Sequence, residues 1–600
     1  MRPYQDPQLP VPERVADLLG RMTAAEKAGL LFHAPVGVGP NGEFAEQSSG
    51  PLPTAPTTAA IRDLNLRCVS LMAPVAACPL ASWHNRLQEL AAQTRLGIPI
   101  LVSSDPRHSA NHNPLTSVAS GGCSQWPEPL GLGALGDEAT VRDFARVVSA
   151  EYAAVGIRMA LHPMADLASE PRWGRTIGTF GADPELVGRL AGAYVEGLQG
   201  PKLSSTSVAS MVKHWPGAGP QTGGLDAHFA QGKDQTYPAG LYELHRSQFR
   251  PSLDAGVAAV MPYYGRPLGV PGLAEVGFAF DREVVAGQLR RYEGYDGLVC
   301  TDFGLLTDTL LADGTVWPAR AWGVEHLDRS ERALLLLDAG VDQFGGEWCP
   351  EVITGLVADG LVSQQRIDES AGRVLRLLFE LGLFENPYVD EQAAVTIVGR
   401  PDFVAAGAAA QRSSMVALSN PSDLLPLSGG IRLYTEGIDP AVAARYAEMV
   451  DHPGDADVAL VRIGAPYEPA HRLPEAFFHQ GRLDLPADQR DKLLNLCATV
   501  PTVIEIFLDR PAVIPELAER AGALLADFGA TDGAVLDVVF GRARPRGRLP
   551  FELPRSMAAV EAHPEDLPGG TPDPVFPLGH NLETDHWTAS LKGDPVADPS

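Results

Sequence analysis

The feature that most constrains this fold is a regular alternation of short apolar, β-rich runs with helical segments between residues 68 and 345. Repeated strand–helix–strand units build parallel sheets, because each helix carries the chain back to the edge where the previous strand began. The predicted strands lie in residues 68–75, 98–105, 156–166, 208–214, 258–264, 297–302 and 339–347. Residues 137–156 and 183–200 carry clear amphipathic helical patterns between them.

Many of these runs end in a polar residue, and this favours one parallel architecture over another. In a (β/α)8 barrel the active site forms at the carboxyl ends of the strands, where such residues converge. An open doubly wound sheet also binds ligands at its strand ends and is the alternative. We predict an α/β protein whose N-terminal part is a TIM-like (β/α)8 barrel.

The pattern changes after the barrel, which indicates a second domain. A helix within residues 366–390 is expected to close the first domain, and a loose stretch follows it. Further predicted strands lie in residues 430–437, 456–464, 501–509 and 522–530. We assign residues 1–390 to the barrel, 391–400 to a linker, 401–552 to a smaller α/β sandwich domain and 553–600 to a partly mobile C-terminal extension.

Composition excludes several classes of partner. The formal net charge of −27 argues against nucleic acid or an anionic membrane, because phosphate binding depends on clustered Lys and Arg. The six cysteines are scattered without a C-x-x-C pair, and no segment reads as a leader or a membrane span. We expect a cytoplasmic protein without metal or cofactor that takes a small carbohydrate or glycoside-sized neutral substrate, and a homo-oligomer is compatible with this expectation.

Charged side chains at three predicted strand ends suggest a pocket for a neutral polyol. Lys213 and His214 end one strand before a tight turn, and Asp302 ends another. The Trp215–Pro216 bond in that turn is one of the few that could be cis. Asp105 and Arg172 add an acceptor and a forked donor. A lone Asp at such a boundary is more often a helix cap, so the cluster as a whole carries the prediction.

Several long motifs resemble glycoside hydrolase family 3, over nearly the whole chain. They occupy residues 16–31, 97–108, 170–188, 212–220, 295–306, 381–390, 542–554 and 575–582, and include "VKHWPGAGP" and "YDGLVCTDFGLL". The resemblance implies a barrel followed by an α/β sandwich domain that contributes to the active site. It also implies retaining, exo-acting hydrolysis of terminal β-linked sugars, with β-D-glucosides as the expected substrates.

The resemblance also assigns roles to individual residues. Asp302 matches the catalytic nucleophile, which forms a covalent glycosyl-Asp intermediate. The residues that match positions holding the sugar in the −1 subsite are Asp105, Arg172, Lys213 and His214. Tyr264 matches a tyrosine close to the nucleophile. Phe303, Trp173, Trp215 and Trp348 stack on the sugar or simply pack, and Glu347 contacts substrate or forms a salt bridge.

The proton donor is the least certain assignment, and three residues compete for it. In many relatives a Glu of the second domain serves, which points first to Glu468 and then to Glu475. If the donor is a carboxyl, retention requires it to lie about 5–5.5 Å from the nucleophile. The N-acetylglucosaminidase branch uses a His held by an Asp instead, and Asp226 and His228 occupy such a motif. We expect these two to shape the pocket rather than to be the acid.

Motif departures leave other functions open. Gly178, Ala182 and Ala218 replace polar residues usual in the family, so subsite shape is less certain than the nucleophile. One alternative within the same family is an enzyme that transfers the glycosyl group to another sugar or to phosphate. Another is an N-acetylglucosaminidase. A non-catalytic carbohydrate-binding protein on the same fold is the alternative from another class.

Overall fold

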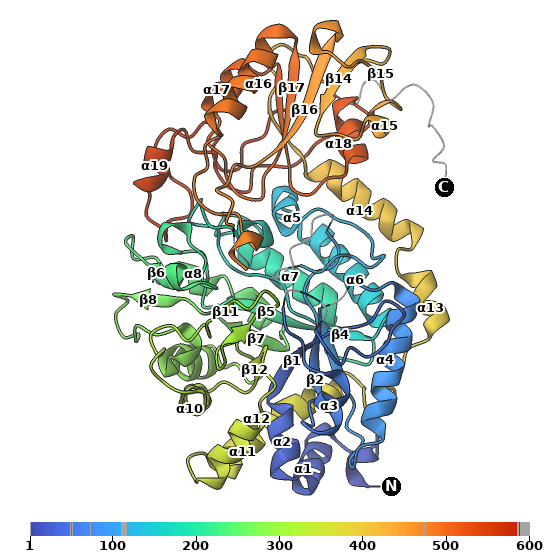
Figure 1. The fold of residues 1–600 in the computed structure, drawn as a ribbon, viewed down its shortest axis with the longest axis vertical. Helices are drawn as coiled ribbons and strands as arrows, with labels where there is room; N and C mark the ends of the chain where they lie inside the picture. Colours follow the sequence, from blue (N-terminus) through green and yellow to red (C-terminus); the bar gives the residue numbers. More distant parts are fainter. Residues whose placement is uncertain are drawn as a thin grey trace.

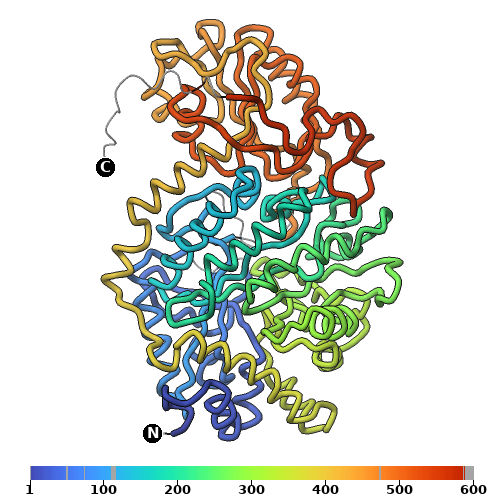
Figure 2. Tube along the Cα trace, turned by 180° about the vertical axis from the view of Figure 1, so that it is seen from behind, coloured from blue at the N-terminus to red at the C-terminus, as the bar shows by residue number. Residues whose placement is uncertain are grey.

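The computed structural model describes residues 2–48, 50, 52–72, 74–109, 117–471, 474–584 and 587. A larger N-terminal domain holds the N-terminus, and a smaller domain packs above it in Figure 1. Figure 2 shows the long connection between them running along one side of the larger domain.

The larger domain is built on a closed barrel of parallel strands. Eight strands lie in the order β12-β1-β2-β3-β4-β5-β7-β9, and each neighbouring pair is parallel. A parallel bridge between Cys300 and Gln343 joins the two outer strands and closes the ring. The strands are β1 Phe32–Val36, β2 Cys68–Leu71, β3 Leu101–Ser104, β4 Ile157–Ala160, β5 Ala209–Trp215, β7 Ala259–Pro262, β9 Leu298–Val299 and β12 Phe344–Gly345. The predicted barrel is therefore confirmed.

The sequence prediction missed the first barrel strand, β1. Its sequence, FHAPV, contains a histidine and a proline, so it lacks the uninterrupted apolar run that marked the other strands. All five of its residues are buried, and His33 reaches Ser103 of β3 at 2.7 Å. This hydrogen bond of Nε2 lowers the cost of burying the polar ring inside the barrel.

Helices surround the barrel because their apolar faces pack against the strands. Asp137 caps α6 by accepting the N–H groups of Ala139 and Thr140, and α6 packs along α7. Helices of the larger domain are α1 Val11–Arg21, α2 Ala24–Leu30, α3 Thr57–Arg62, α4 Ala77–Ala92, α5 Pro129–Leu135, α6 Glu138–Ala154, α7 Val187–Gln199, α8 Tyr242–Ser247, α9 Arg250–Asp254, α10 Arg329–Ala339, α11 Glu351–Ala358 and α12 Gln364–Glu380. The helices expected in residues 137–156, 183–200 and 366–390 are α6, α7 and α12.

Two small strand pairs extend the loops after the barrel strands. The parallel pair β6 (Asp234–Thr236) and β8 (Arg266–Leu268) follows β5 and β7. The antiparallel pair β10 (Thr309–Leu310) and β11 (Val316–Trp317) follows β9. These additions enlarge the carboxyl end of the barrel, where the predicted active site lies.

The segment predicted as a linker, residues 391–400, contains helix α13 (Glu391–Ile397). This helix packs against α4 and α6, so the connection is held on the barrel rather than loose. Helix α14 (Pro401–Ser414) then leads into the second domain. Asp390 caps α13 through the N–H groups of Gln392 and Ala393.

The smaller domain contains a six-stranded sheet in the order β13-β18-β17-β16-β14-β15. All its pairs are parallel except β13 with β18. Its elements are β13 Val416–Ser419, β14 Arg432–Glu436, α15 Pro440–Ala443, β15 Glu448–Met449, β16 Val458–Gly464, α16 Ala487–Thr499, β17 Thr502–Phe507, α17 Pro515–Arg520, β18 Ala523–Asp527 and α18 Asp532–Val539. The predicted strands are β14, β16, β17 and β18, whereas β13 and β15 were not predicted.

The C-terminal segment returns to the barrel domain after the sheet. Beyond helix α19 (Met557–Glu561), the carboxylate of Asp566 accepts the backbone N–H groups of Ala239 and Leu241. Trp587 is fully buried in the core of the smaller domain. Of the extension predicted to be partly mobile, residues 553–600, the last part, residues 585–586 and 588–600, lies outside the described residues. Within the described chain, we find no helix with the length and apolar character that crossing a bilayer requires.

Candidate active site

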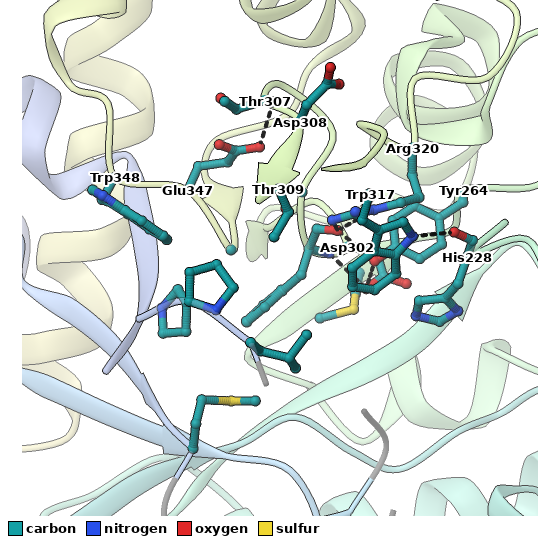
Figure 3. A pocket seen from close by; sticks show the side chains of 18 of the residues that line it. His228, Tyr264, Asp302, Thr307, Asp308, Thr309, Trp317, Arg320, Glu347 and Trp348 are labelled. Atoms are coloured by element: carbon teal, nitrogen blue, oxygen red, sulfur yellow. Dashed lines mark hydrogen bonds between the residues drawn. The ribbon is translucent and has the colours of Figure 1, made fainter. Parts of the chain in front are cut away.

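A cavity of about 480 Å³ opens at the carboxyl ends of the barrel strands. Figure 3 shows its side chains, with Asp302, Tyr264, His228, Arg320 and Trp317 gathered on one side and Trp348 on the other. The residues of the sequence prediction that line it are Asp105, Lys213, His214, His228, Tyr264, Asp302, Phe303, Glu347 and Trp348. The structure therefore brings together most of the predicted site.

Asp302 lies just after β9 and is held through only one of its carboxylate oxygens. Oδ1 accepts the Tyr264 hydroxyl at 2.9 Å and the Phe303 backbone N–H at 2.8 Å. Oδ2 has no hydrogen-bond partner among the described residues, and it lies 3.7 Å from Nε2 of His214. Asp302 lines the cavity, and a carboxylate that is held through one oxygen while the other is unpaired is suited to nucleophilic attack.

The Tyr264 hydroxyl lies near two acceptors, Asp302 Oδ1 and the carbonyl oxygen of Phe303, and we assign its proton to the bond with Asp302. The hydroxyl also lies 2.7 Å from the carbonyl oxygen of Phe303. That carbonyl already accepts two N–H groups of Arg320, at 3.2 and 2.8 Å. Burial and the nearby charge of Asp302 raise the pKa of Tyr264 well above its usual value, so it stays a donor.

Lys213 and His214 sit side by side on β5 and face different carboxylates. Nζ of Lys213 donates to Asp105 Oδ1 at 2.8 Å. Nδ1 of His214 lies 2.8 Å from Asp166, which also accepts the backbone N–H groups of His214 and Ala218. Burial, with the charges of Arg175 and Lys213, holds the pKa of His214 well below its usual value, so the ring is neutral.

Asp166 and the turn after His214 complete this part of the site. Burial raises the pKa of Asp166 to about 7, against the effect of the N–H groups that it accepts. Asp166 follows β4 and ends the predicted strand segment 156–166, but the sequence prediction gave it no role. The Trp215–Pro216 bond is cis, as the sequence suggested, and the Lys213–His214 bond is cis as well.

The arginines that line the cavity are Arg175, Arg320 and Arg329, whereas the sequence prediction named Arg172. Nη1 of Arg175 lies 3.0 Å from Nε2 of His214. Arg172 is not a lining residue of the cavity, because its guanidinium binds both carboxylate oxygens of the buried Glu170 at 2.7 and 2.9 Å. Both arginines belong to the motif EPRWGR, so the motif located the right loop and spacing alone could not choose between them.

His228 and Asp226 form a hydrogen-bonded pair at the cavity wall. Nδ1 of His228 lies 2.5 Å from Asp226 Oδ1, and Trp173 donates to the other carboxylate oxygen at 3.1 Å. Burial opposes ionisation of Asp226, but the charge and hydrogen bonds of His228 outweigh it and lower the pKa of this carboxyl. The His228 ring lies 4.9 Å from the Tyr264 ring, edge to face. Nε2 makes no hydrogen bond to any described residue, and His228 is one of the residues that line the cavity.

Neither Glu468 nor Glu475 is among the described residues that line this cavity. Glu468 is exposed, and its carboxylate lies over Gly481, where an added Cβ would meet Oε2 at 2.2 Å. Glu475 begins a short 3₁₀ turn, Glu475–Phe477, and is half-buried. The structure does not bring these two predicted acids to the nucleophile, because the loop that carries them turns Phe478 toward the barrel instead.

Other carboxyl groups that line the cavity are engaged elsewhere. Asp105 binds Lys213, and Asp308 accepts the Ala319 backbone N–H at 2.9 Å. Glu351 pairs with Arg329. Glu347 accepts the N–H groups of Leu306 and Thr307, and burial raises its pKa. Among the described residues, Asp302 is the lining carboxyl that has a buried oxygen without a hydrogen-bond partner.

One group of possible metal ligands lies outside the cavity. His108, Cys123 and Glu151 offer ligand atoms within 4.8 Å of one another, a grouping that sequence spacing did not reveal. Glu151 already accepts hydrogen bonds from Ser124 and Gly399, and it lies 2.8 Å from His108 Nε2. These bonds explain a buried carboxylate without an ion, and they tie the Asp105 loop to the interdomain connection.

Comparison with known families decides the classification. Residues 77–377 match the Glycosyl hydrolase family 3 N terminal domain, and residues 340–584 match the family's C-terminal domain. The chain belongs to glycosyl hydrolase family 3. The predicted resemblance is therefore confirmed, and the family covers both domains of the fold.

Two relatives are similar to this chain over nearly the whole length of both proteins. The chain is 48% identical over 586 residues to Beta-glucosidase C of Emericella nidulans, covering 97% of this chain and 93% of the relative. It is 38% identical over 610 residues to a Periplasmic beta-glucosidase/beta-xylosidase of Dickeya chrysanthemi, covering 97% and 91%.

Solved structures share the fold at lower sequence identity. A β-glucosidase of Erythrobacter marinus aligns with a TM-score of 0.77 and 21% identity, over 97% of this chain and 84% of that one. The β-glucosidase of Listeria innocua in complex with isofagomine aligns with a TM-score of 0.73 and 24% identity, over 92% and 77%. These likenesses support the two-domain fold.

Proposed function

We propose that this family 3 enzyme hydrolyses terminal β-D-glucosides with retention of configuration, through a glucosyl-Asp302 intermediate. The relatives named β-glucosidase at 48% and 38% identity support the substrate class. The observation that carries the mechanism is the buried Oδ2 of Asp302, a residue that lines the cavity, because this oxygen has no hydrogen-bond partner among the described residues. Asp105, Lys213, His214 and Arg175 surround this position with the donors and acceptors that sugar hydroxyls require.

The first step forms a bond between Asp302 Oδ2 and the anomeric carbon. The bond from that carbon to the leaving oxygen breaks, and its electron pair takes the proton from Nε2 of the His228 imidazolium. Asp226 stabilises that imidazolium through Nδ1. In the second step neutral His228 removes a proton from water, the water oxygen attacks the anomeric carbon, and the Asp302 carboxylate leaves.

His228 is proposed as the proton donor because of its place in the structure. Of the three candidates, it lines the cavity, whereas Glu468 and Glu475 do not among the described lining residues. Its partner Asp226 is buried, has a lowered pKa and lies within hydrogen-bond distance of Nδ1 of His228. This arrangement replaces the second carboxyl that the sequence prediction expected.

The nucleophile is tested with aryl β-glycosides of several sugars. Wild type is expected to cleave β-D-glucosides best and to release β-glucose first, as followed by NMR. Asp302→Ala is expected to lose turnover altogether. Activity near the wild-type level in Asp302→Ala would overturn the assignment, and failure of wild type to cleave any glycoside would favour a binding protein. Release of glucose 1-phosphate or a disaccharide in place of glucose would favour a transferase.

The proton donor is tested by varying the leaving group. Loss of a general acid costs about 10²- to 10⁴-fold with a poor leaving group, and far less with 2,4-dinitrophenol, which needs little protonation. His228→Ala is expected to lose methyl β-D-glucoside cleavage selectively, with azide restoring turnover of the dinitrophenyl glucoside. Glu468→Ala and Glu475→Ala serve as controls and are expected to behave as wild type. A selective loss in either control would identify that glutamate as the donor.

A further inference from the structure

Arg510 is a buried arginine whose two terminal nitrogens donate to backbone carbonyl groups. It follows β17 and its residue is 0% exposed. Its guanidinium donates to the carbonyl oxygens of Pro466 at 2.6 Å, Arg172 at 2.9 Å, Gln480 at 3.0 Å, Arg482 at 3.2 Å and Gly481 at 3.3 Å. Burial lowers its pKa to about 10, so it remains charged at neutral pH.

The five carbonyls come from two domains. Four belong to the two ends of a second-domain loop, residues 465–482, and the fifth belongs to Arg172 on the barrel. Arg510 therefore closes the base of this loop and fastens it to the barrel. Charge-assisted hydrogen bonds of this kind are stronger than those between neutral groups.

Further contacts hold the same loop base. The Glu468 backbone N–H donates to Gln480 at 2.8 Å, and the His479 ring stacks on Tyr467 with centroids 3.7 Å apart. His479 Nδ1 also binds Asp509, the residue before Arg510. On the barrel side, a Cβ added to Gly174 would lie 2.1 Å from the His479 carbonyl oxygen, so only glycine permits this approach.

The loop places one side chain, Phe478, against the proposed proton donor. Phe478 is 3% exposed, and its ring lies 5.1 Å from His228 and 5.6 Å from Phe229. On the barrel side, the His228 ring contacts Tyr264, and Trp317 donates to the His228 carbonyl at 2.9 Å. The second domain thus contributes an apolar contact to a ring that the barrel holds through hydrogen bonds.

We infer that Arg510 is a positioning residue, which holds the second-domain loop on the barrel so that Phe478 orients the imidazole of His228. The second domain then supplies the orientation of the proton donor rather than the donor itself. This inference rests on the function and on the role of His228 proposed above. It also gives Arg172 a structural part, through its carbonyl, in place of the sugar contact that the sequence suggested.

The test compares kcat/KM for 2,4-dinitrophenyl β-D-glucoside with kcat/KM for methyl β-D-glucoside. A misdirected donor slows only the substrate that needs protonation, so the ratio of the two values is expected to rise about 10-fold or more in Arg510→Met and Phe478→Ala. A loss of folded enzyme lowers both values equally and leaves the ratio unchanged. The matched control is Arg482→Met, which removes an exposed arginine of the same loop that pairs with Asp484.

Each outcome decides between the two hypotheses. An unchanged ratio in Phe478→Ala and Arg510→Met, together with a raised ratio in His228→Ala, would overturn the positioning role and keep the donor. An unchanged ratio in His228→Ala would overturn the donor itself. If Arg510→Met does not fold, Phe478→Ala and Gly174→Ala perturb the contact without exposing the carbonyl groups, and their ratios decide. A raised ratio in Arg482→Met would also contradict the inference.

Discussion

The hydrogen bond from Tyr264 to Asp302 makes a specific prediction about which chemical step it serves. Tyr264→Phe removes one of the two donors on Oδ1 and leaves the Phe303 N–H. The first step consumes the carboxylate charge, whereas the second step regenerates it. A donor to that charge therefore assists departure of Asp302 more than its attack, and the variant is expected to be slow in releasing glucose.

The magnitude follows from the charge on the acceptor. A hydrogen bond to an ionised group contributes about 1.5–3 kcal/mol, which corresponds to a fall of about 10- to 150-fold in the second step. Because the intermediate then accumulates, KM for 2,4-dinitrophenyl β-D-glucoside is expected to fall together with kcat. Stopped-flow measurement is expected to show a burst of dinitrophenol equal to the enzyme concentration.

Tyr263→Phe is the matched control for this prediction. Tyr263 is the neighbouring buried tyrosine, and its hydroxyl has no hydrogen-bond partner within the described part of the chain. It is expected to keep kcat within about twofold, since replacing an unpaired hydroxyl removes no bond. A Tyr264→Phe enzyme with wild-type kcat, or one with reduced kcat but no burst, would refute the reasoning.

Three further predictions concern the site and stability. Arg175→Lys is expected to lower kcat/KM about 10- to 100-fold, since a lysine cannot reproduce the guanidinium contacts, whereas Arg172→Lys should have little effect; equal losses would contradict the assignment. Trp587→Ala is expected to lower the free energy of unfolding in urea by about 3–5 kcal/mol, and a loss below 1 kcal/mol would contradict its burial. Burial lowers the pKa of His84 to about 4. The buried neutral ring therefore stabilises the folded state above pH 6.5, and this stabilisation is lost as the pH falls toward 4. The stability difference between wild type and His84→Gln should therefore shrink by about 2 kcal/mol from pH 7 to pH 5, and a constant difference would contradict it.

The barrel and its central residues could be predicted because they depend on local pattern. Apolar runs that end in Asp302, Lys213 and Asp105 mark parallel strands, and the carboxyl ends of such strands meet at one face. Strand β1 was not predicted because its polar His33 finds a hydrogen-bond partner in Ser103, which is distant in the sequence. The pattern of one segment cannot reveal that partner.

The remaining site residues depend on contacts between distant segments. Arg172 and Arg175 are equally plausible in sequence, and the buried Glu170 beside Arg172 decides which one faces the cavity. The motif around Glu468 and Glu475 located the second-domain loop correctly. Which side chain of that loop faces the barrel is set by Arg510 and its carbonyl partners, which only the folded chain brings together.

The measurement that most directly tests the central claim is chemical trapping of the intermediate. A 2-deoxy-2-fluoro-β-glucoside with a good leaving group should inactivate the enzyme, because the fluorine slows breakdown of the covalent intermediate. Mass spectrometry of the digested protein is expected to find one fluoroglucosyl group, attached to Asp302. Attachment to any other residue, or inactivation without a covalent label, would contradict the account.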